Sequence, residues 1–380
     1  MVAMDDPERK SVKQLKTDDG PADQPLPLEG RGVSRRALLI GAGLIAAAGA
    51  GIAIARAVAP EQDSTASSLD PESPPTSSTT ALLAEPDTSR TSQSDSAGET
   101  SLSELARPAL PARAVSMWIN TFERPTVAEL PADVLETVNL VIFAMAQSAE
   151  SGTGILKWEP GFQSYDDIAK DISRLTSATK PVLLGIGGSN DGGITLVSDK
   201  NVDEFCGSIR FFVETFGFTG IDIDLEPSGS SWSQEALVKT VRTLKDEYGA
   251  NFLVGLTVAL YAEHTARWLS LANELGDAYD YWSPMLYDYP EAHDERLVPD
   301  ALKKIQTAVD GGVPSSKQIL GFMCNAYYNT SPVAVTAQVW QAAEAKYPDL
   351  RGAFIWESKL ELASNYQWTR EVGAPLISAG

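Results

Sequence analysis

Short apolar runs recur from Ala112 to the carboxyl terminus, and longer segments with mixed polarity separate them. Eight of these runs predict β-strands, because they are rich in β-branched and aromatic residues and are bounded by turn residues. Their starts lie 24 to 44 residues apart, which is the spacing expected when a crossover helix follows each parallel strand. The pattern therefore predicts an α/β protein whose strands close into a (β/α)8 barrel. The predicted strands are 114–119, 138–144, 182–186, 220–225, 252–259, 281–286, 318–323 and 352–356.

Four of the segments between the strands carry apolar residues at intervals of three and four, which predicts amphipathic helices. Gly249 and Gly311 follow two of these segments as helix stops. We expect the aromatic residues of these helices to face the core and not a cofactor, and no cofactor is predicted. The apolar positions are Tyr165, Ile168, Ile172, Leu175, Phe205, Ile209, Phe212, Phe216, Leu237, Val241, Leu244, Tyr248, Leu302, Ile305 and Val309.

The part of the chain before the barrel has a different composition. Residues 1–33 are polar, charged and proline-bearing, and residues 60–111 are rich in Ser, Thr, Pro, Asp and Glu with few large apolar side chains. Such segments cannot bury enough apolar surface to offset their conformational entropy. We expect a disordered amino-terminal region and a disordered linker, followed by a single catalytic domain at 112–380.

Between these polar segments, residues 34–59 form a Gly- and Ala-rich apolar run preceded by Arg35 and Arg36. A pair of arginines before a moderately hydrophobic run is typical of a twin-arginine export signal. A plain membrane anchor is the alternative, since about 18 apolar residues can span a bilayer. Both interpretations predict a secreted or cell-surface protein, in the second case anchored in the membrane.

Composition excludes several classes of function. The 380 residues carry a formal net charge of -21, so that no basic surface is expected to bind nucleic acid. The two cysteines, Cys206 and Cys324, fall on different barrel units and predict free thiols. With only His264 and His293, a histidine-rich metal site is excluded, and no metal site is predicted. We expect the domain to be a monomer.

Candidate chemistry lies on the fourth predicted strand. Its period of two places Asp222, Asp224 and Glu226 on one side and apolar residues on the other, and Pro227 ends the run. With 51 acidic residues, such spacing is expected about once by chance, so a charged surface strand is the plain alternative. The apolar residues between the acids indicate a buried strand instead. Carboxylates that share a buried face push one another's pKa values apart, as acid catalysis near neutral pH requires.

The same run resembles the signature strand of glycoside hydrolase family 18, the chitinase family, whose pattern is D-G-x-D-x-D-x-E. Gly220 and the three acids match, whereas Thr219 replaces the first Asp. The third strand resembles the S-x-G-G segment of the family with Gly185 in place of Ser, residues 285–288 match M-x-Y-D, and residues 352–356 resemble the last strand with its Trp. The resemblance covers 112–380 and implies a TIM barrel with its site at the carboxyl ends of the strands.

The resemblance also implies roles for individual residues. Glu226 would be the general acid, Asp224 would orient the acetamido group of the substrate, Asp222 would share a proton with Asp224, and Tyr287 would hydrogen-bond the acetamido carbonyl. The charges of Asp222 and Asp224 are expected to raise the pKa of Glu226. Further contacts with the sugar are expected from Trp356, Asp288 and Met285.

Each of these motif residues also has a structural interpretation. Gly187 and Gly188 could form an ordinary tight turn, Tyr287 could be a strand aromatic, and Trp356 could belong to the core. The two departures, Thr219 and Gly185, concern the tuning of Asp222, although the hydroxyl of Thr219 could still offer it a hydrogen bond.

Three functions follow as hypotheses. The first is an exported, endo-acting chitinase that cleaves β-1,4-linked N-acetylglucosamine polymers with retention, by a substrate-assisted mechanism. The second is an endo-β-N-acetylglucosaminidase that acts on the chitobiose core of N-glycans. The third is a sugar-binding barrel without hydrolytic activity, against which the retained Glu226 argues.

Overall fold

A computed structural model of the chain describes residues 107–161, 163–227, 229–260, 262–324 and 330–378. The expected export signal or anchor at 34–59, residues 1–33 and most of the linker lie outside these ranges. Within the described ranges, no helix has the length and apolar character needed to cross a membrane. The same ranges contain no group of three or more His, Cys, Asp or Glu side chains placed to hold a metal ion.

Eight parallel strands form the centre of the domain, and all eight were predicted from the sequence. Neighbours pair in the order β10, β11, β1, β2, β4, β6, β8 and β9. Parallel bridges from Trp282 to Gln318 and from Met285 to Gly321 join β9 to β10, so that the sheet closes into a barrel. The strands are β1 (Ala114–Asn120), β2 (Leu140–Ser148), β4 (Val182–Gly187), β6 (Gly220–Asp224), β8 (Leu253–Val258), β9 (Tyr281–Pro284), β10 (Ile319–Phe322) and β11 (Gly352–Ile355).

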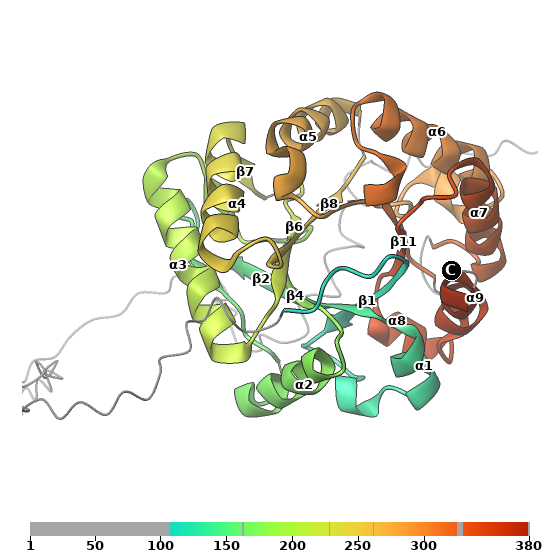
Figure 1. The fold of residues 1–380 in the computed structure, drawn as a ribbon, viewed down its shortest axis with the longest axis horizontal. Helices are drawn as coiled ribbons and strands as arrows, with labels where there is room; N and C mark the ends of the chain where they lie inside the picture. The colour runs from blue at the N-terminus through green and yellow to red at the C-terminus, as the bar shows by residue number, and fades with distance from the viewer. Residues whose placement is uncertain (1–106, 162, 228, 261, 325–329, 379–380) are drawn as a thin grey trace, which may run out of the picture. The chain divides into compact units, whose positions relative to one another are not determined.

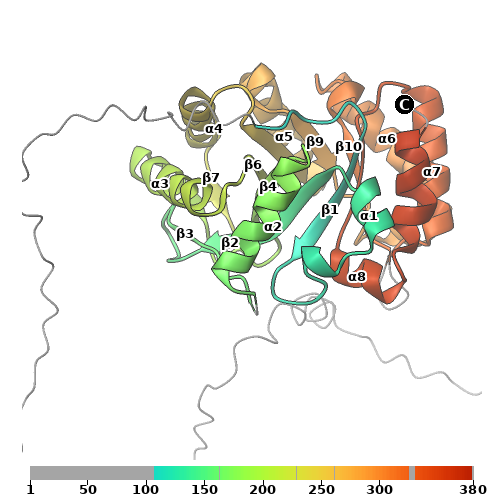
Figure 2. The same cartoon turned by 60° about the horizontal axis from the view of Figure 1, so that its bottom comes forward.

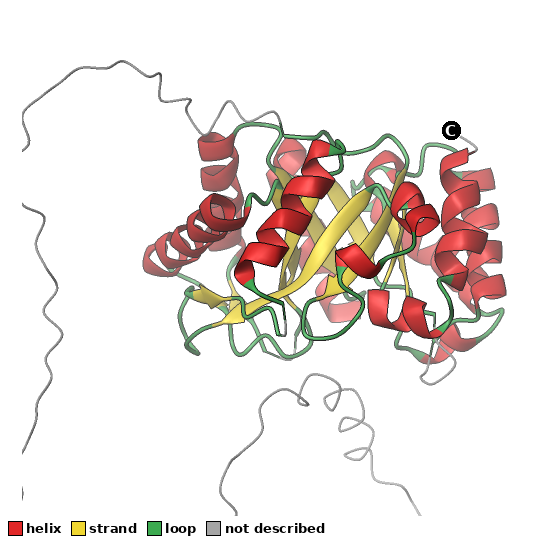
Figure 3. Ribbon diagram, turned by 90° about the horizontal axis from the view of Figure 1, so that it is seen from below, coloured by secondary structure: helices red, strands yellow, loops and turns green. Residues whose placement is uncertain are grey.

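Helices surround these strands (Figures 1 and 3). The four amphipathic segments correspond to α2, α3, α4 and α6, but Tyr165 is 53% exposed and does not face the core as expected. It is the first residue of α2 and therefore lies beyond the end of the buried face. The helices are α1 (Ala132–Thr137), α2 (Tyr165–Ser177), α3 (Asp199–Phe216), α4 (Gln234–Tyr248), α5 (Ala262–Leu275), α6 (Leu297–Asp310), α7 (Val333–Lys346), α8 (Ser358–Ala363) and α9 (Ala374–Ser378).

The sequence of α3 explains both of its ends. Ser198 has extended backbone geometry, and its side chain accepts a hydrogen bond from the amide of Asn201, which satisfies a free N–H in the first turn. Such a cap stabilises a helix by about 1 kcal/mol. Gly217 ends the helix with φ of 82°, a left-handed conformation that favours glycine. The chain then turns directly into β6, so the end of α3 fixes where the acidic strand begins.

Side chains pack on both faces of the barrel wall. A large apolar layer lies between the strands and the helices, and a smaller cluster fills the barrel interior. The interior cluster contains bulky residues such as Trp118, Tyr281 and Phe354, and these are almost fully buried. Polar residues of the interior, including Asp222 and Thr257, lie among these apolar side chains. The acids therefore occupy a barrel interior from which packed side chains exclude water.

Three short strands were not predicted. β3 (Leu156–Lys157) pairs with the end of β2, while β5 (Thr195–Leu196) and β7 (Ser231–Trp232) pair with each other. β3 and β7 lie on the side of the barrel where α3 is found (Figure 2). Strands of two residues are too short to leave an alternating pattern in the sequence. They nevertheless join the loops that follow β2, β4 and β6 beyond the carboxyl ends of these strands.

The first described residues pack against the opposite end of the barrel. The guanidinium of Arg107 donates a hydrogen bond to the carbonyl oxygen of Tyr248 over 2.9 Å and lies 5.0 Å from the centroid of its ring. Leu110 packs against the interior cluster, and Arg351 donates to the carbonyl oxygen of Pro111. Tyr248 ends α4, which precedes β8, so these contacts lie at the amino ends of the strands. The packed domain therefore starts at least five residues before the boundary expected at 112.

Candidate active site

The three acids lie at increasing height along β6. Asp222 is fully buried, Asp224 is 5% exposed, and Glu226 follows two residues after the strand and is half-buried. Alternation along β6 places Asp222 and Asp224 on one face, and Tyr281 of the barrel interior contacts Asp222, so this face is the inward one. Glu226 is thus the acid best placed to meet a ligand that approaches the carboxyl ends of the strands.

Gly187, the last residue of β4, and Gly188, which follows it, hold the backbone of Asp224 in place. Gly187 pairs with Asp224 in the parallel register, and a Cβ atom at Gly187 would lie 2.2 Å from the carbonyl oxygen of Asp224. Both Gly187 and Gly188 have left-handed φ angles, of 113° and 84°, which glycine tolerates best. The amide of Gly188 donates a hydrogen bond to the carbonyl oxygen of Asp224 over 2.8 Å. The two glycines therefore support the acid directly and are not an independent turn.

Asp222 has a different partner from the one expected. The hydroxyl of Thr219 accepts from the amide of Val182 over 2.9 Å and donates to its carbonyl oxygen over 3.1 Å, so the hydrogen bonds of Thr219 tie β6 to β4. The expectation that it could serve Asp222 is wrong, because its side chain points to the neighbouring backbone. Instead the hydroxyl of Tyr281 donates to Oδ2 of Asp222. Burial raises the pKa of Asp222 to about 6, and the hydrogen bond from Tyr281 opposes this shift.

The electrostatics of the other two acids are linked. Burial raises the pKa of Asp224 well above its usual value, and the charges of Glu226, Asp222 and Asp191 add to the shift. Burial also raises the pKa of Glu226 to about 7, with further contributions from Asp288 and Asp191. We expected the Asp222 and Asp224 charges to be the cause. The charges of Asp288 and Asp191 instead add to the effect of burial on Glu226, while Asp224 and Glu226 interact with each other, so that the pKa of each depends on the charge of the other.

Asp191 is an acid of this cluster that the sequence analysis missed. It lies in the loop after β4, is fully buried, and its Oδ1 accepts from the amide of Gly193 over 2.8 Å. Its Oδ2 has no hydrogen-bond partner among the described residues. Burial raises the pKa of Asp191, and hydrogen bonds from Gly193, Ile194 and Ser230 oppose the shift. No sequence pattern marked Asp191, because it lies in a loop and loops carry no periodicity.

The predicted sugar-contacting residues lie around the same rim. Trp356 follows β11, is half-buried, and packs with its ring centroid 5.3 Å from that of Trp118. Tyr287 follows β9 and is also half-buried, with its ring 6.3 Å from Phe354. Burial and the nearby acids, Asp224 first among them, raise the pKa of the Tyr287 hydroxyl well above its usual value, so that it remains a hydrogen-bond donor.

The remaining two predicted contacts differ in exposure. Asp288 is exposed and has a left-handed φ of 61°. Burial of part of its carboxylate raises its pKa, and the charge of His293 opposes this. Met285 is only 9% exposed and belongs to the interior cluster, so it contributes mainly packing beneath the rim.

A second buried acid on this face was also missed. Glu357 follows Trp356 directly and is 3% exposed. Burial raises its pKa to about 7, and a hydrogen bond with Asn120 and the charge of Lys359 oppose the shift. Its Oε2 has no hydrogen-bond partner within the described part of the chain. No sequence pattern marked Glu357, because the motif of the last strand ends at the Trp before it.

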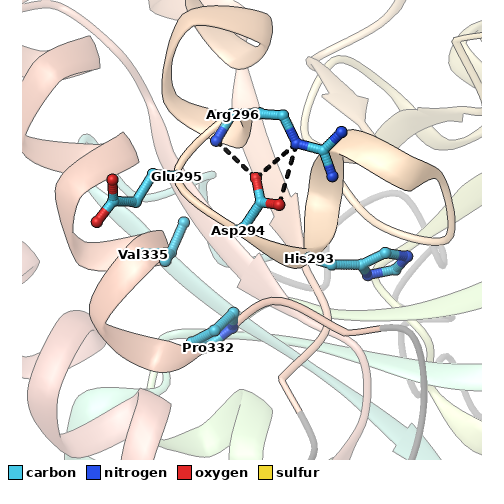
Figure 4. A pocket seen from close by; sticks show the side chains of 6 residues that line it. All are labelled: His293, Asp294, Glu295, Arg296, Pro332 and Val335. Atoms are coloured by element: carbon cyan, nitrogen blue, oxygen red, sulfur yellow. Dashed lines mark hydrogen bonds and ion pairs between the residues drawn. The ribbon is translucent and has the colours of Figure 1, made fainter. Parts of the chain in front are cut away.

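A pocket of about 420 Å³ lies between the segment before α6 and the start of α7. Figure 4 shows Asp294 facing Arg296, whose side chain it holds, and His293 on the other side of the loop. None of the predicted site residues lines this pocket. The acids therefore do not belong to this pocket.

The arrangement combines three chemical abilities. Glu226, with a pKa of about 7, can hold a proton near neutral pH and release it to a bound group. The buried pair of Asp222 and Asp224 can stabilise a positive charge that develops nearby. Tyr287 can donate a hydrogen bond to a ligand bound near these acids.

Comparison with known proteins identifies relatives of this domain. The family model for glycosyl hydrolases family 18 matches residues 116–373. Chitinase Chi52 of Paenibacillus xylanexedens is 30% identical over 155 residues, and chitinase D of Niallia circulans is 31% identical over 156 residues. Each match covers 37% of this chain and 29% of the relative, so the chain spans less than a third of their length.

A solved structure has the same fold. Putative chitinase A from Streptomyces coelicolor superposes with a TM-score of 0.60 over 70% of this chain and 99% of that protein. The sequence identity of this pair is 19%, so the likeness concerns the fold alone.

Proposed function

The chain belongs to glycosyl hydrolases family 18, and on that premise we propose that its barrel hydrolyses β-1,4-linked N-acetylglucosamine polymers such as chitin, with retention and with the substrate as nucleophile. The observation that carries this proposal is the pair formed by Asp224 and Glu226. A half-exposed acid with a raised pKa directly follows a buried acid on the same strand face. Glu226 can protonate a leaving group, while Asp224 faces the positive charge that develops on the substrate.

The reaction proceeds in two steps. In the first, Glu226 transfers its proton to the glycosidic oxygen, the bond from C1 to that oxygen breaks, and the acetamido carbonyl oxygen bonds to C1. The positive charge moves into the cyclised acetamido group, where Asp224 and Tyr287 orient it. In the second step, water attacks C1 and Glu226 accepts its proton. The bond from C1 to the acetamido oxygen breaks, and the configuration at C1 is retained.

The spacing of the acids argues for this route over the common two-carboxylate schemes. Glu226 follows Asp224 by two residues, just beyond the end of β6, so both acids approach the site from the same strand end. A conventional nucleophile would have to attack from the sugar face opposite the general acid. Asp224 flanks Glu226 on its own side of the rim and is badly placed for that attack. The acetamido oxygen of the substrate is the remaining nucleophile.

An endo mode of action is part of the proposal. The described part of the interval between β10 and β11 holds one helix, α7 (Val333–Lys346). Family members that thread long polymer chains carry an extra α+β insertion there. One helix leaves room for an open groove over the rim, and such a groove supports cleavage at internal bonds.

The experiment compares oligomers of N-acetylglucosamine with the same oligomers after deacetylation. We expect hydrolysis with retention of the first set only. Glu226→Gln should lower kcat by about 10²- to 10⁴-fold, the usual contribution of a general acid, while oligomer binding persists. Equal cleavage of both sets would contradict the mechanism. A preference for a high-mannose glycoprotein would favour the endo-β-N-acetylglucosaminidase alternative, and binding without hydrolysis by the unaltered protein would favour a sugar-binding barrel.

We also propose that residues 34–59 direct export of the folded protein through the twin-arginine pathway, with the domain released or held at the cell surface. This proposal rests on Arg35 and Arg36 before the Gly- and Ala-rich run.

A further inference from the structure

We propose that Tyr281 is a positioning residue for the reaction: its hydroxyl holds one oxygen of Asp222, so that the other oxygen is left to share a proton with Asp224. This inference rests on the proposed function, because it assigns a role in the same site. The residue lies six positions before Tyr287, on the inward face of β9.

The register of the barrel places Tyr281 beside Asp222. Asp222 pairs with Gly255 of β8, and Gly255 pairs with Tyr281 of β9, so the three form one row across neighbouring strands. A Cβ atom at Gly255 would lie 2.2 Å from Cζ of the Tyr281 ring and 2.4 Å from its hydroxyl oxygen. The absent side chain of Gly255 is therefore what allows the Tyr281 ring to lie across β8 and its hydroxyl to reach Oδ2 of Asp222.

The other side of Asp222 offers no comparable partner. It pairs there with Gly185 of β4, whose free space is filled by Trp118, since a Cβ atom at Gly185 would lie 2.3 Å from Cζ3 of that indole. Thr219 uses its hydroxyl on the backbone of Val182. Gly185 and Thr219, the two positions at which this chain departs from the family pattern, thus provide no hydrogen bond to Asp222. Its partners come from the side of β8 and β9.

The free oxygens of the two acids complete the arrangement. Oδ1 of Asp222 and Oδ1 of Asp224 are both buried, and neither has a hydrogen-bond partner among the residues described. A single proton shared between the two carboxylates would satisfy one oxygen of each. Because Tyr281 occupies Oδ2, it determines which oxygen of Asp222 is available for this proton.

The groups that face Asp222 come from several strands. β6 contributes Asp224, β8 contributes Thr257, and β9 contributes Tyr281 and Tyr287. From β1 the interior receives the uncharged indole of Trp118, and β4 contributes glycine at this level. Burial raises the pKa of Asp222, and the Tyr281 hydrogen bond is the largest effect opposing that shift. Burial and Asp222 raise the pKa of Tyr281 well above its usual value, so the hydroxyl stays protonated and can donate throughout the working range.

Removing the hydroxyl should therefore move one limb of the pH profile. In Tyr281→Phe the ring still fills the space over Gly255, but the ionised form of Asp222 loses a donor and its pKa rises. The acid pair then takes up its second proton at a higher pH and loses the negative charge that stabilises the intermediate. We expect the acid limb of kcat to move to higher pH and kcat to fall about tenfold or more. The alkaline limb, which reports Glu226, should stay in place.

The matched control is Tyr279→Phe. Tyr279 is also a buried tyrosine, but it lies before β9 and its ring contacts Lys317, 4.1 Å from the centroid, at the amino end of the barrel. Tyr279→Phe should leave both limbs unchanged.

The titration of Asp222 can also be followed without catalysis. In full-length protein with ¹³C-labelled aspartate carboxyl groups, the Asp222 signal is assigned by its loss in Asp222→Asn. We expect its midpoint to move to higher pH in Tyr281→Phe and not in Tyr279→Phe. An unchanged midpoint and an unchanged acid limb in Tyr281→Phe would overturn the inference and leave a packing role. If the unaltered protein hydrolyses no substrate, the proposed function fails, while the carboxyl titration still decides the role of Tyr281.

Discussion

Gly188 donates its backbone N–H to the carbonyl oxygen of Asp224 over 2.8 Å. The bond fixes the end of β6 to the end of β4, at the point where the chain leaves both strands. The carboxyl group of Asp224 is thereby set by a rigid backbone and not by a mobile loop. The position of Glu226, two residues later, follows from that of Asp224. The surrounding acids then determine up to which pH Glu226 carries a proton.

The first prediction concerns the alkaline limb of the pH profile. Glu226 must be protonated to act, and its pKa of about 7 depends on burial first and on the charge of Asp288 next. Asp288→Asn removes that charge, so the pKa of Glu226 falls and the alkaline limb of kcat should move to lower pH. The measurement is kcat on a soluble N-acetylglucosamine oligomer across pH 4 to 9.

Asp294→Asn is the control for this shift. Asp294 lies on the same loop, but its carboxylate is paired with Arg296. Its replacement should leave the limb in place. A limb that stays in place in Asp288→Asn would show that the charge of Asp288 does not set the acidity of Glu226.

The second prediction concerns the cyclised intermediate. A thiazoline analogue of that intermediate should inhibit the unaltered protein strongly, because it places the charged ring beside Asp224 and Tyr287. Asp224→Ala should lower kcat by roughly 10²-fold or more and lower the affinity for the analogue by a similar factor. Both the intermediate and the analogue rely on the charge of Asp224. Calorimetric titration of both proteins with the analogue checks this. Unchanged affinity in Asp224→Ala would remove Asp224 from the proposed mechanism.

The third prediction concerns stability. The pKa of Glu357 is raised from the usual 4.5 to about 7 in the folded protein, so folding favours its protonated form. That contribution is fully present below about pH 4.5 and is lost as the pH rises to about 7. Glu357→Gln replaces the titrating carboxyl group by a neutral amide and so removes this loss of stability. The free energy of unfolding of the variant, relative to the unaltered protein, should therefore rise by about 3 kcal/mol between pH 4.5 and 8.

Urea unfolding at the two pH values measures this difference. Glu295→Gln serves as the control, because Glu295 is exposed and its replacement should give a difference that does not change with pH. A constant difference for Glu357→Gln as well would contradict the prediction, because it would mean that folding does not raise the pKa of Glu357.

The fourth prediction concerns export. Replacing both Arg35 and Arg36 by Lys keeps the charge but removes the paired arginines that the pathway reads. The protein should then remain in the cytoplasm of a host with a working twin-arginine system, as immunoblots of cell fractions would reveal. Export at the original level would show that another route carries the protein.

The sequence predicted the barrel well because its strands are buried on both faces and are therefore continuously apolar. The period of two also placed Asp222, Asp224 and Glu226 on one face. The same period, counted back from Tyr287, would have placed Tyr281 on the inward face. The period of two did not predict that Gly255 leaves the space in which the ring of Tyr281 lies. This space depends on the register between β8 and β9, which the period does not contain.

Other features of the site could not be predicted from local patterns. Asp191 reaches the cluster through a loop, and loops carry no periodicity from which a direction can be inferred. Glu357 lies directly after the Trp of the last strand, and its burial depends on how α8 packs against β1. The raised pKa of Glu226 likewise depends on which acids lie close to it in space, and Asp191 contributes to it although no pattern marked that residue.

The contact of Arg107 with Tyr248 has a practical consequence for handling this protein. The chain enters the domain at the amino ends of the strands, whereas the acids lie at the carboxyl ends. A bead, tag or surface joined through residue 107 would thus be attached at the end of the barrel opposite the acids. Molecules immobilised in this way should all present their catalytic side to the surrounding solution, so that even a large insoluble polymer could reach Glu226 without the support in its path.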